Sequence, residues 1–139
     1  MIRILCIGRI RAGYYRDAAE DYQRRLRRLA RIDIVEIPDS SEERQAEQIL
    51  EKLGEARVLA CDAGGDVVTS EELSEELGSH GAIDFLIGGP DGLGHAVITR
   101  ADRSVAFGRI TLPHELARVV LLEQIYRGFT ILKGHPYHR

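Results

Sequence analysis

Residues 84–92 read DFLIGGPDG, in which a short apolar run passes directly into glycine, proline and aspartate. An apolar run that ends at glycine is typical of a buried strand that leaves its sheet for a loop. Glycines at such a point permit positive φ and let backbone amides come close to a ligand. The turn matches neither a dinucleotide-binding fingerprint nor a phosphate-binding loop, so by itself it is explained equally well as structural.

Strand-like runs and helical patterns alternate along the rest of the chain. We expect strands at residues 2–7, 32–37, 57–62, 84–87 and 104–107, and helices at residues 14–29, 41–53, 69–78 and 113–129. Gly64 and Gly65 are expected to form the turn after the third strand. Such alternation predicts right-handed crossovers, and therefore an α/β fold with a mostly parallel sheet flanked by helices. The length of 139 residues predicts one domain, residues 1–139.

Composition places the chain among ordinary globular proteins, with 44% hydrophobic and 29% charged residues. No apolar run approaches the roughly 18 residues of a membrane span, and the first strand is too quickly followed by arginines to resemble a secretory signal. Cys6 and Cys61 lie in separate strand-like runs, which predicts two buried thiols in a reducing compartment. We therefore expect a cytoplasmic protein without a membrane partner.

Charge is unevenly distributed along the chain. The formal net charge of −3 argues against a protein that binds nucleic acid with its whole surface. Residues 1–31, however, contain nine arginines and only three acidic residues. This segment is either a local patch that faces phosphates or a solvated helix face.

A second loop leaves the predicted sheet at residues 107–113, which read FGRITLP and precede the longest predicted helix. In an open α/β sheet, ligands bind where neighbouring strands end at their carboxyl edges. The exits after Cys61, Ile87 and Phe107 would then surround one small molecule. We therefore expect a single ligand pocket built from three loops.

The longest predicted helix carries charged residues on an otherwise apolar face. Glu123 and Arg127 lie four residues apart on that face, and a buried pair needs compensating hydrogen bonds. Their placement therefore predicts a subunit interface or a polar site. Arg118 lies off that face and is interpreted either as an exposed helix charge or as a phosphate ligand.

The last six residues, 134–139, read GHPYHR and combine a phenol, two imidazoles and a guanidinium. Such groups stack on unpaired bases and bind phosphate, although an aromatic tail that merely packs is the simpler interpretation. The two histidines have no cysteine or acidic third ligand nearby, so we expect no metal site. Neither cysteine lies beside a histidine in the manner of a catalytic nucleophile.

Four motifs together resemble one known family. They are IGGPDG at 87–92, TLPH at 111–114, RV at 118–119 with EQIYR at 123–127, and YHR at 137–139. In this order and over the whole chain they are similar to the ribosomal RNA large subunit methyltransferase H family of the SPOUT class. The resemblance implies a trefoil knot in the C-terminal half, an obligate homodimer and S-adenosylmethionine as methyl donor. It also implies methylation of ring N3 of a pseudouridine in large-subunit (23S) ribosomal RNA, on the ribosome rather than on free RNA.

The resemblance also assigns residues to the cofactor pocket. They are Cys61, Gly88, Phe107, Gly108, Arg109, Ile110, Thr111 and Leu112. Cys61 departs from the family, which often has a larger aliphatic residue there, and the segment between Pro38 and Arg57 is shorter than is common. Neither departure affects the matched motifs.

Catalytic roles are assigned by the resemblance to the tail, acting in the neighbouring subunit. His138 would accept the N3 proton, since an imidazole can do so near neutral pH. Tyr137 would stack on the target base, and Arg139 would hold a phosphate or stabilise negative charge on the ring oxygens. His114 competes with His138 as the base.

Two other functions fit the same residues. A ribosome-binding factor without catalysis would use the arginine-rich segment and the tail only to dock, and adenosylmethionine affinity would separate it from an enzyme. A transfer RNA methyltransferase of the same knotted class would share every pocket residue and differ in its docking surface.

Overall fold

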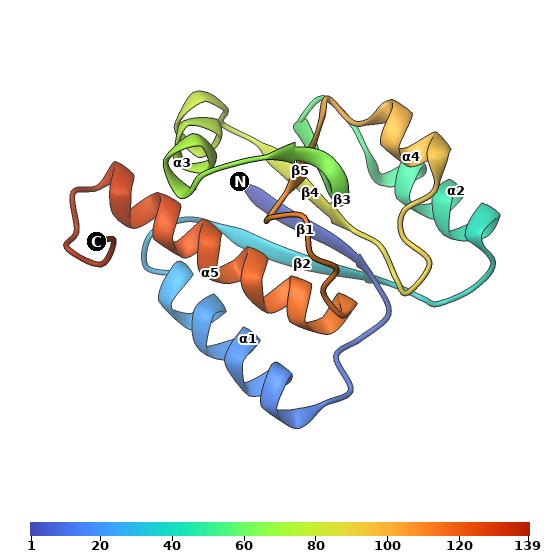
Figure 1. Cartoon of the computed structure of the whole chain (residues 1–139), viewed down its shortest axis with the longest axis horizontal. Helices are drawn as coiled ribbons and strands as arrows, with labels where there is room; N and C mark the ends of the chain where they lie inside the picture. Colours follow the sequence, from blue (N-terminus) through green and yellow to red (C-terminus); the bar gives the residue numbers. More distant parts are fainter.

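The computed structural model describes residues 1–139 as one parallel five-stranded sheet with helices on both faces (Figure 1). The strands are β1 (Ile2–Ile7), β2 (Ile32–Ile37), β3 (Arg57–Val67), β4 (Ile83–Ile87) and β5 (Arg103–Ala106). The helices are α1 (Gly13–Leu26), α2 (Glu42–Lys52), α3 (Ser70–Ser79), α4 (His95–Arg100) and α5 (His114–Leu132). The strand order is β2-β1-β4-β3-β5, and every neighbouring pair is parallel. The predicted α/β class is confirmed, while the knot stays a prediction.

The sheet separates two apolar cores. Alternate side chains of the strands point to opposite faces, so Phe85 joins α1, α3 and α5 on one side, whereas Leu86 joins α2 and α4 on the other. Figure 1 shows α2 and α4 side by side at the right and α1 beside α5 in the lower half. Because both faces are covered, the central strands are mostly apolar and buried, as in β4, whose five residues are all buried.

Asp84 is the one carboxylate inside β4, and it is only 1% exposed. Arg3 on the neighbouring strand β1 satisfies it, because Nε donates to Oδ1 at 2.8 Å and Nη2 donates to Oδ2 at 2.7 Å. The bidentate pair therefore fixes β1 against β4 at the amino ends of both strands.

Two predicted helix starts are confirmed by their caps. The hydroxyl of Ser41 accepts from the amide of Arg44 at 3.2 Å, and α2 begins at the next residue. At α3, Thr69 and Glu72 form a reciprocal capping box. The predicted helix at residues 14–29 ends earlier, at Leu26, and the predicted helix at residues 113–129 continues to Leu132.

Two local predictions were wrong. Helix α4 was missed, because its six residues are too few to show a helical repeat. The third strand does not end at a turn of Gly64 and Gly65. It bulges there and resumes, since Cys61 and Asp66 both pair with Val105 of β5.

The bulge of β3 lies at the edge where β3, β4 and β5 end. At Gly65 a Cβ atom would lie 2.6 Å from the backbone carbon of Ser104, so only glycine permits this approach. Residues 62–65 are thus pushed out of the ladder and form one wall of the site below. No helix of the structure is long and apolar enough to cross a membrane.

Candidate active site

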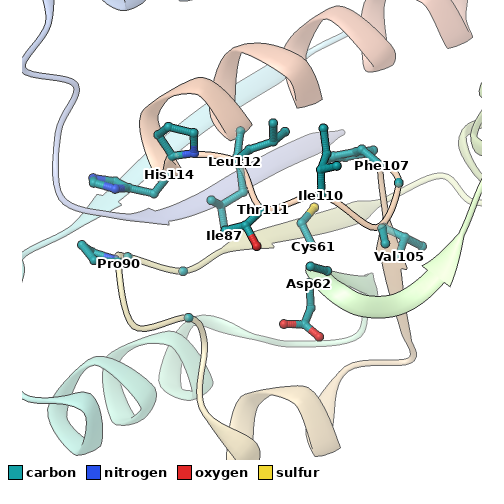
Figure 2. A pocket seen from close by; sticks show the side chains of 18 residues that line it. Cys61, Asp62, Ile87, Pro90, Val105, Phe107, Ile110, Thr111, Leu112 and His114 are labelled. Carbon is teal, nitrogen blue, oxygen red and sulfur yellow. The ribbon is translucent and has the colours of Figure 1, made fainter.

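A pocket of about 590 Å³ lies where β3, β4 and β5 end at their carboxyl edges. Figure 2 shows side chains from the three strand exits and from the start of α5 converging on it. Seven of the eight residues that the sequence assigned to a cofactor pocket line it, namely Cys61, Gly88, Phe107, Gly108, Ile110, Thr111 and Leu112. The structure therefore brings these residues together, and their contact with a cofactor stays a prediction.

The glycine turn after β4 forms one wall of the pocket. It closes through the amide of Gly92, which donates to the carbonyl of Gly89 at 3.0 Å. A Cβ atom on Gly88 would lie 2.6 Å from the carbonyl oxygen of Gly92. Glycine is therefore required at position 88 because the turn folds back on itself. This requirement is structural and does not depend on a bound ligand.

The loop after β5 forms the opposite wall. Gly108 has a φ of +116°, which residues with a side chain rarely adopt, and nothing lies within 4 Å of where its Cβ would be. The backbone is therefore open to the pocket at this point. Ile110 adds an apolar side chain that is 72% exposed, so this wall presents a hydrophobic surface to whatever binds.

Arg109 is the one assigned residue that does not line the pocket. Its Nη1 donates to the carbonyls of Ala63 and Gly65, each at 2.7 Å. The side chain thus reaches across to the bulge of β3 and holds it in place. Because Ala63 lines the pocket, Arg109 positions a wall of it.

Cys61 contributes an apolar surface to the pocket. Burial raises the pKa of its thiol to about 12, so the sulfur stays protonated at neutral pH. This environment disfavours a thiolate nucleophile at this position, and no histidine lies next to Cys61 in the sequence.

Two polar pocket residues were missing from the predicted cofactor set. Asp62 follows Cys61 directly and its Oδ2 accepts from the amide of Gly64 at 3.1 Å. The sequence did contain a signal for Asp62, because it places a carboxylate immediately after a predicted buried strand. His114, considered above only as a base, is the first residue of α5 and lines the pocket (Figure 2).

Comparison with known proteins identifies the family. The sequence model described as "Predicted SPOUT methyltransferase" matches residues 1–138. A protein of Clostridium beijerinckii named ribosomal RNA large subunit methyltransferase H is 43% identical, and the alignment covers 99% of each chain. A protein of the same name from Caldicellulosiruptor saccharolyticus is 40% identical over 100% of each chain. The chain belongs to this SPOUT methyltransferase family. The resemblance drawn from the sequence is thereby confirmed.

The fold of this SPOUT methyltransferase is also similar to a solved structure. A probable methylase family protein from Haemophilus influenzae Rd KW20 matches with a TM-score of 0.63 at 16% identity. The match covers 99% of this chain and 70% of the other. At this identity the likeness concerns the fold alone.

The tail that the sequence assigned to catalysis lies away from the pocket of its own chain. His114 at the pocket begins α5, whereas residues 137–139 follow the other end of that helix (Figure 1). A helix of 19 residues is about 28 Å long. The tail folds back only as far as Glu123, about 13 Å of helix beyond His114, so Tyr137, His138 and Arg139 lie outside the pocket of their own chain.

Instead, the tail contacts α5 and α3. The hydroxyl of Tyr137 donates to Oε2 of Glu123 at 2.8 Å, and the Arg127 guanidinium lies 4.8 Å from the centre of the Tyr137 ring. Burial and the nearby Glu123 carboxylate both raise the pKa of Tyr137. Burial alone would raise the pKa of Glu123, but hydrogen bonds from Arg127 and Tyr137 outweigh it and lower that pKa. Glu123 and Arg127 thus form a polar cluster with the tail of their own chain, and the subunit interface predicted as the other alternative stays a prediction.

His138 uses both ring nitrogens in this arrangement. Arg127 can only donate, so its bond of 3.0 Å makes Nδ1 of His138 an acceptor. The proton is then on Nε2, which donates to Oε1 of Glu71 at 2.7 Å. A role for His138 as a base therefore requires the bond from Arg127 to open first.

Proposed function

We propose that the chain is an S-adenosylmethionine-dependent methyltransferase that acts on large-subunit ribosomal RNA. The single observation that carries this proposal is the pocket at the ends of β3, β4 and β5, which two of the family's motifs, at 87–92 and 111–114, help to line. Relatives named for large-subunit ribosomal RNA methylation match the chain over its whole length, which supports this class of substrate.

The pocket suits a nucleoside that carries an amino-acid chain. Its volume of about 590 Å³ lies within the range of small-ligand sites, and half of its lining residues are apolar. We infer that Leu112 and Ile110 pack against the adenine, while backbone groups at Gly88 and Gly108 bind its polar edges. The Asp62 carboxylate would accept from sugar hydroxyls. The bound donor supplies a methyl group activated by a sulfonium.

We further infer that the methyl acceptor is ring N3 of a pseudouridine in 23S ribosomal RNA. The attacking nitrogen must be held in line with the methyl group at contact distance and must lose its proton. His138, Tyr137 and Arg139 would act on the base as proton acceptor, stacking surface and anion-stabilising group. His114 is the alternative base, and its place in the pocket of the same chain supports it.

The distance between tail and pocket supports a homodimer in which the tail of one chain serves the pocket of the other. We place this dimer in the cytoplasm, on the assembled ribosome, with residues 1–139 as one catalytic domain. Arg127 is the residue that would change partners, because it now holds His138.

The first experiment measures cofactor binding by calorimetry. The parent chain should bind S-adenosylmethionine, whereas Gly88→Val should not, because its side chain would meet the backbone of Gly92. Gly54→Val is the matched control, since nothing lies within 4 Å of its Cβ position. If the parent chain binds no cofactor at millimolar concentration, the enzyme is refuted and a ribosome-binding factor replaces it.

The second experiment identifies the substrate. Ribosomal and transfer RNA from a strain that lacks the protein are mapped by mass spectrometry, before and after incubation with purified protein and cofactor. We expect one N3-methylated pseudouridine to be lost from 23S ribosomal RNA and restored on ribosomes. A methyl group lost from transfer RNA instead would assign the chain to the transfer RNA enzymes of the class.

A further inference from the structure

A second cleft, of about 950 Å³, lies between α1, the loop before it, β2 and the first turns of α5. We call it the arginine cleft. Its charged side chains are Arg9, Arg11, Arg16, Arg118, Glu20 and Glu36. None of these residues belongs to the cofactor pocket or to the tail.

Arg118 lies at the bottom of the cleft, where an acidic partner balances its charge. Its side chain is only 5% exposed, and its Nη1 donates to Glu36 at 2.7 Å. Its Nη2 donates to the carbonyl of Gly8 at 2.9 Å. The interpretation of Arg118 as an exposed helix charge was therefore wrong, because the guanidinium is buried and paired.

The other three arginines carry the charge of the cleft. Arg9, Arg11 and Arg16 are exposed and form no ion pair, and only Glu20 among the remaining lining residues is acidic. By contrast, Arg24 and Arg25 on the same helix both pair with Asp21. Three unpaired guanidinium groups in one hollow produce a positive potential on a chain whose net charge is −3. The cleft is therefore suited to an anion.

The position of the cleft identifies the anion. Ala117 lines the cofactor pocket, and the next residue, Arg118, lines the cleft, so the two hollows flank the first turns of α5. Glu115 fixes this arrangement, because its Oε1 accepts from the amides of Arg11 at 2.9 Å and of Ala12 at 3.1 Å. A polyanion whose reactive unit entered the pocket would continue into the cleft.

We propose that the arginine cleft binds backbone phosphates of the RNA strand beside the nucleotide that is methylated. The proposal rests on the proposed function. Phosphate contacts of this kind position a nucleic acid without reading its sequence. Ile34 and Ala19 give the cleft an apolar floor, which suits the sugar of a nucleotide better than a free inorganic anion.

The test compares two double variants that remove the same charge. Arg9→Gln with Arg16→Gln removes two guanidinium groups from the cleft. Arg27→Gln with Arg28→Gln is the matched control, because both residues are exposed, unpaired and outside the cleft. Co-sedimentation measures the affinity for ribosomes, and filter binding measures the affinity for protein-free large-subunit ribosomal RNA, each across a series of salt concentrations. Thermal melts check that both variants fold.

We expect the cleft variant to weaken binding several-fold at low salt. The slope of log affinity against log salt should fall by about one for each phosphate that the variant no longer neutralises. The control should keep the parent slope. Equal slopes of ribosome binding for the two variants would overturn the proposal, and so would the absence of salt-dependent ribosome binding by the parent chain.

A ribosomal protein as the partner of the cleft would give a different result. The cleft variant would then bind protein-free RNA as the parent does but bind and methylate ribosomes poorly, which also overturns the proposal. Calorimetry with S-adenosylmethionine separates the two levels of inference. If the parent chain binds no S-adenosylmethionine, the proposed function is refuted. If the parent chain binds S-adenosylmethionine but the cleft variant and its control show the same salt dependence, only the cleft proposal is refuted.

Discussion

Replacing Arg109 by alanine should weaken cofactor binding without removing any atom from the pocket lining. The substitution breaks the two bonds of 2.7 Å to the carbonyls of Ala63 and Gly65. A hydrogen bond to a charged group contributes about 1.5–3 kcal/mol, and exposed carbonyls regain water when it is lost. We therefore take about 1.5–2 kcal/mol for the pair together, which is a loss of affinity of about tenfold to thirtyfold.

The measurements are calorimetry with S-adenosylmethionine and hydrogen exchange of the free protein. Faster exchange is expected in the bulge at residues 62–65, because these residues lose their side-chain clamp from the β5 loop. Arg100→Ala is the control, since Arg100 also donates to one backbone carbonyl, that of Gly54 at 3.0 Å, but lies outside the pocket. It should leave cofactor affinity unchanged.

Two results would refute this reasoning. If Arg109→Ala binds the cofactor as the parent does, the bulge needs no clamp. If affinity falls while exchange in the bulge stays that of the parent, Arg109 contacts the cofactor directly, as the sequence indicated. Arg109→Lys sharpens the distinction, because it keeps the charge but replaces the planar guanidinium with a single ammonium group.

Three further predictions concern the tail, the sheet and acid stability. Deleting residues 137–139 should abolish ribosome methylation but leave cofactor affinity unchanged. Mixing the truncated chain with the Gly88→Val chain should restore partial activity, because a heterodimer combines the intact pocket of one chain with the intact tail of the other. Heterodimers that form but stay inactive would exclude a shared site. Arg3→Ala leaves Asp84 buried and unpaired, so denaturant titration should report a loss of about 3–5 kcal/mol, and a loss below about 1 kcal/mol would contradict the pairing. Hydrogen bonds from Arg57 and Arg103 outweigh burial and lower the pKa of Glu76. Its contribution to stability is therefore complete above the ordinary value of 4.5 and lost as pH falls through the lowered pKa, so Glu76→Gln should flatten the acid limb of a stability profile.

The sequence predicted the sheet and the pocket because both depend on local signals. Apolar runs that end in glycine marked the strands that deliver Gly88 and Gly108, and parallel order then placed their ends together. Long helices with clear caps, such as the one that follows Thr69, were also recognisable. The loops that leave these strands could thus be predicted because a few consecutive residues determine each of them.

The missed features depend on contacts between distant residues. The bulge of β3 exists because its second half pairs again with Val105, about forty positions later in the chain. Arg109 was assigned to the cofactor by the family resemblance, yet its length lets it reach Ala63 instead. The docking of His138 on Glu71 likewise joins segments that no local pattern connects.

The order of the strands has a consequence for synthesis of the protein. Strand β1 is made first, but one of its two partners is β4, and Arg3 pairs with a residue 81 positions later. A ribosome releases the chain from its N-terminus, so β1 must wait with one hydrogen-bonding edge open and apolar side chains on both faces. The nascent chain is therefore most prone to aggregate before residue 87 emerges, and we expect chaperones to bind it during that interval.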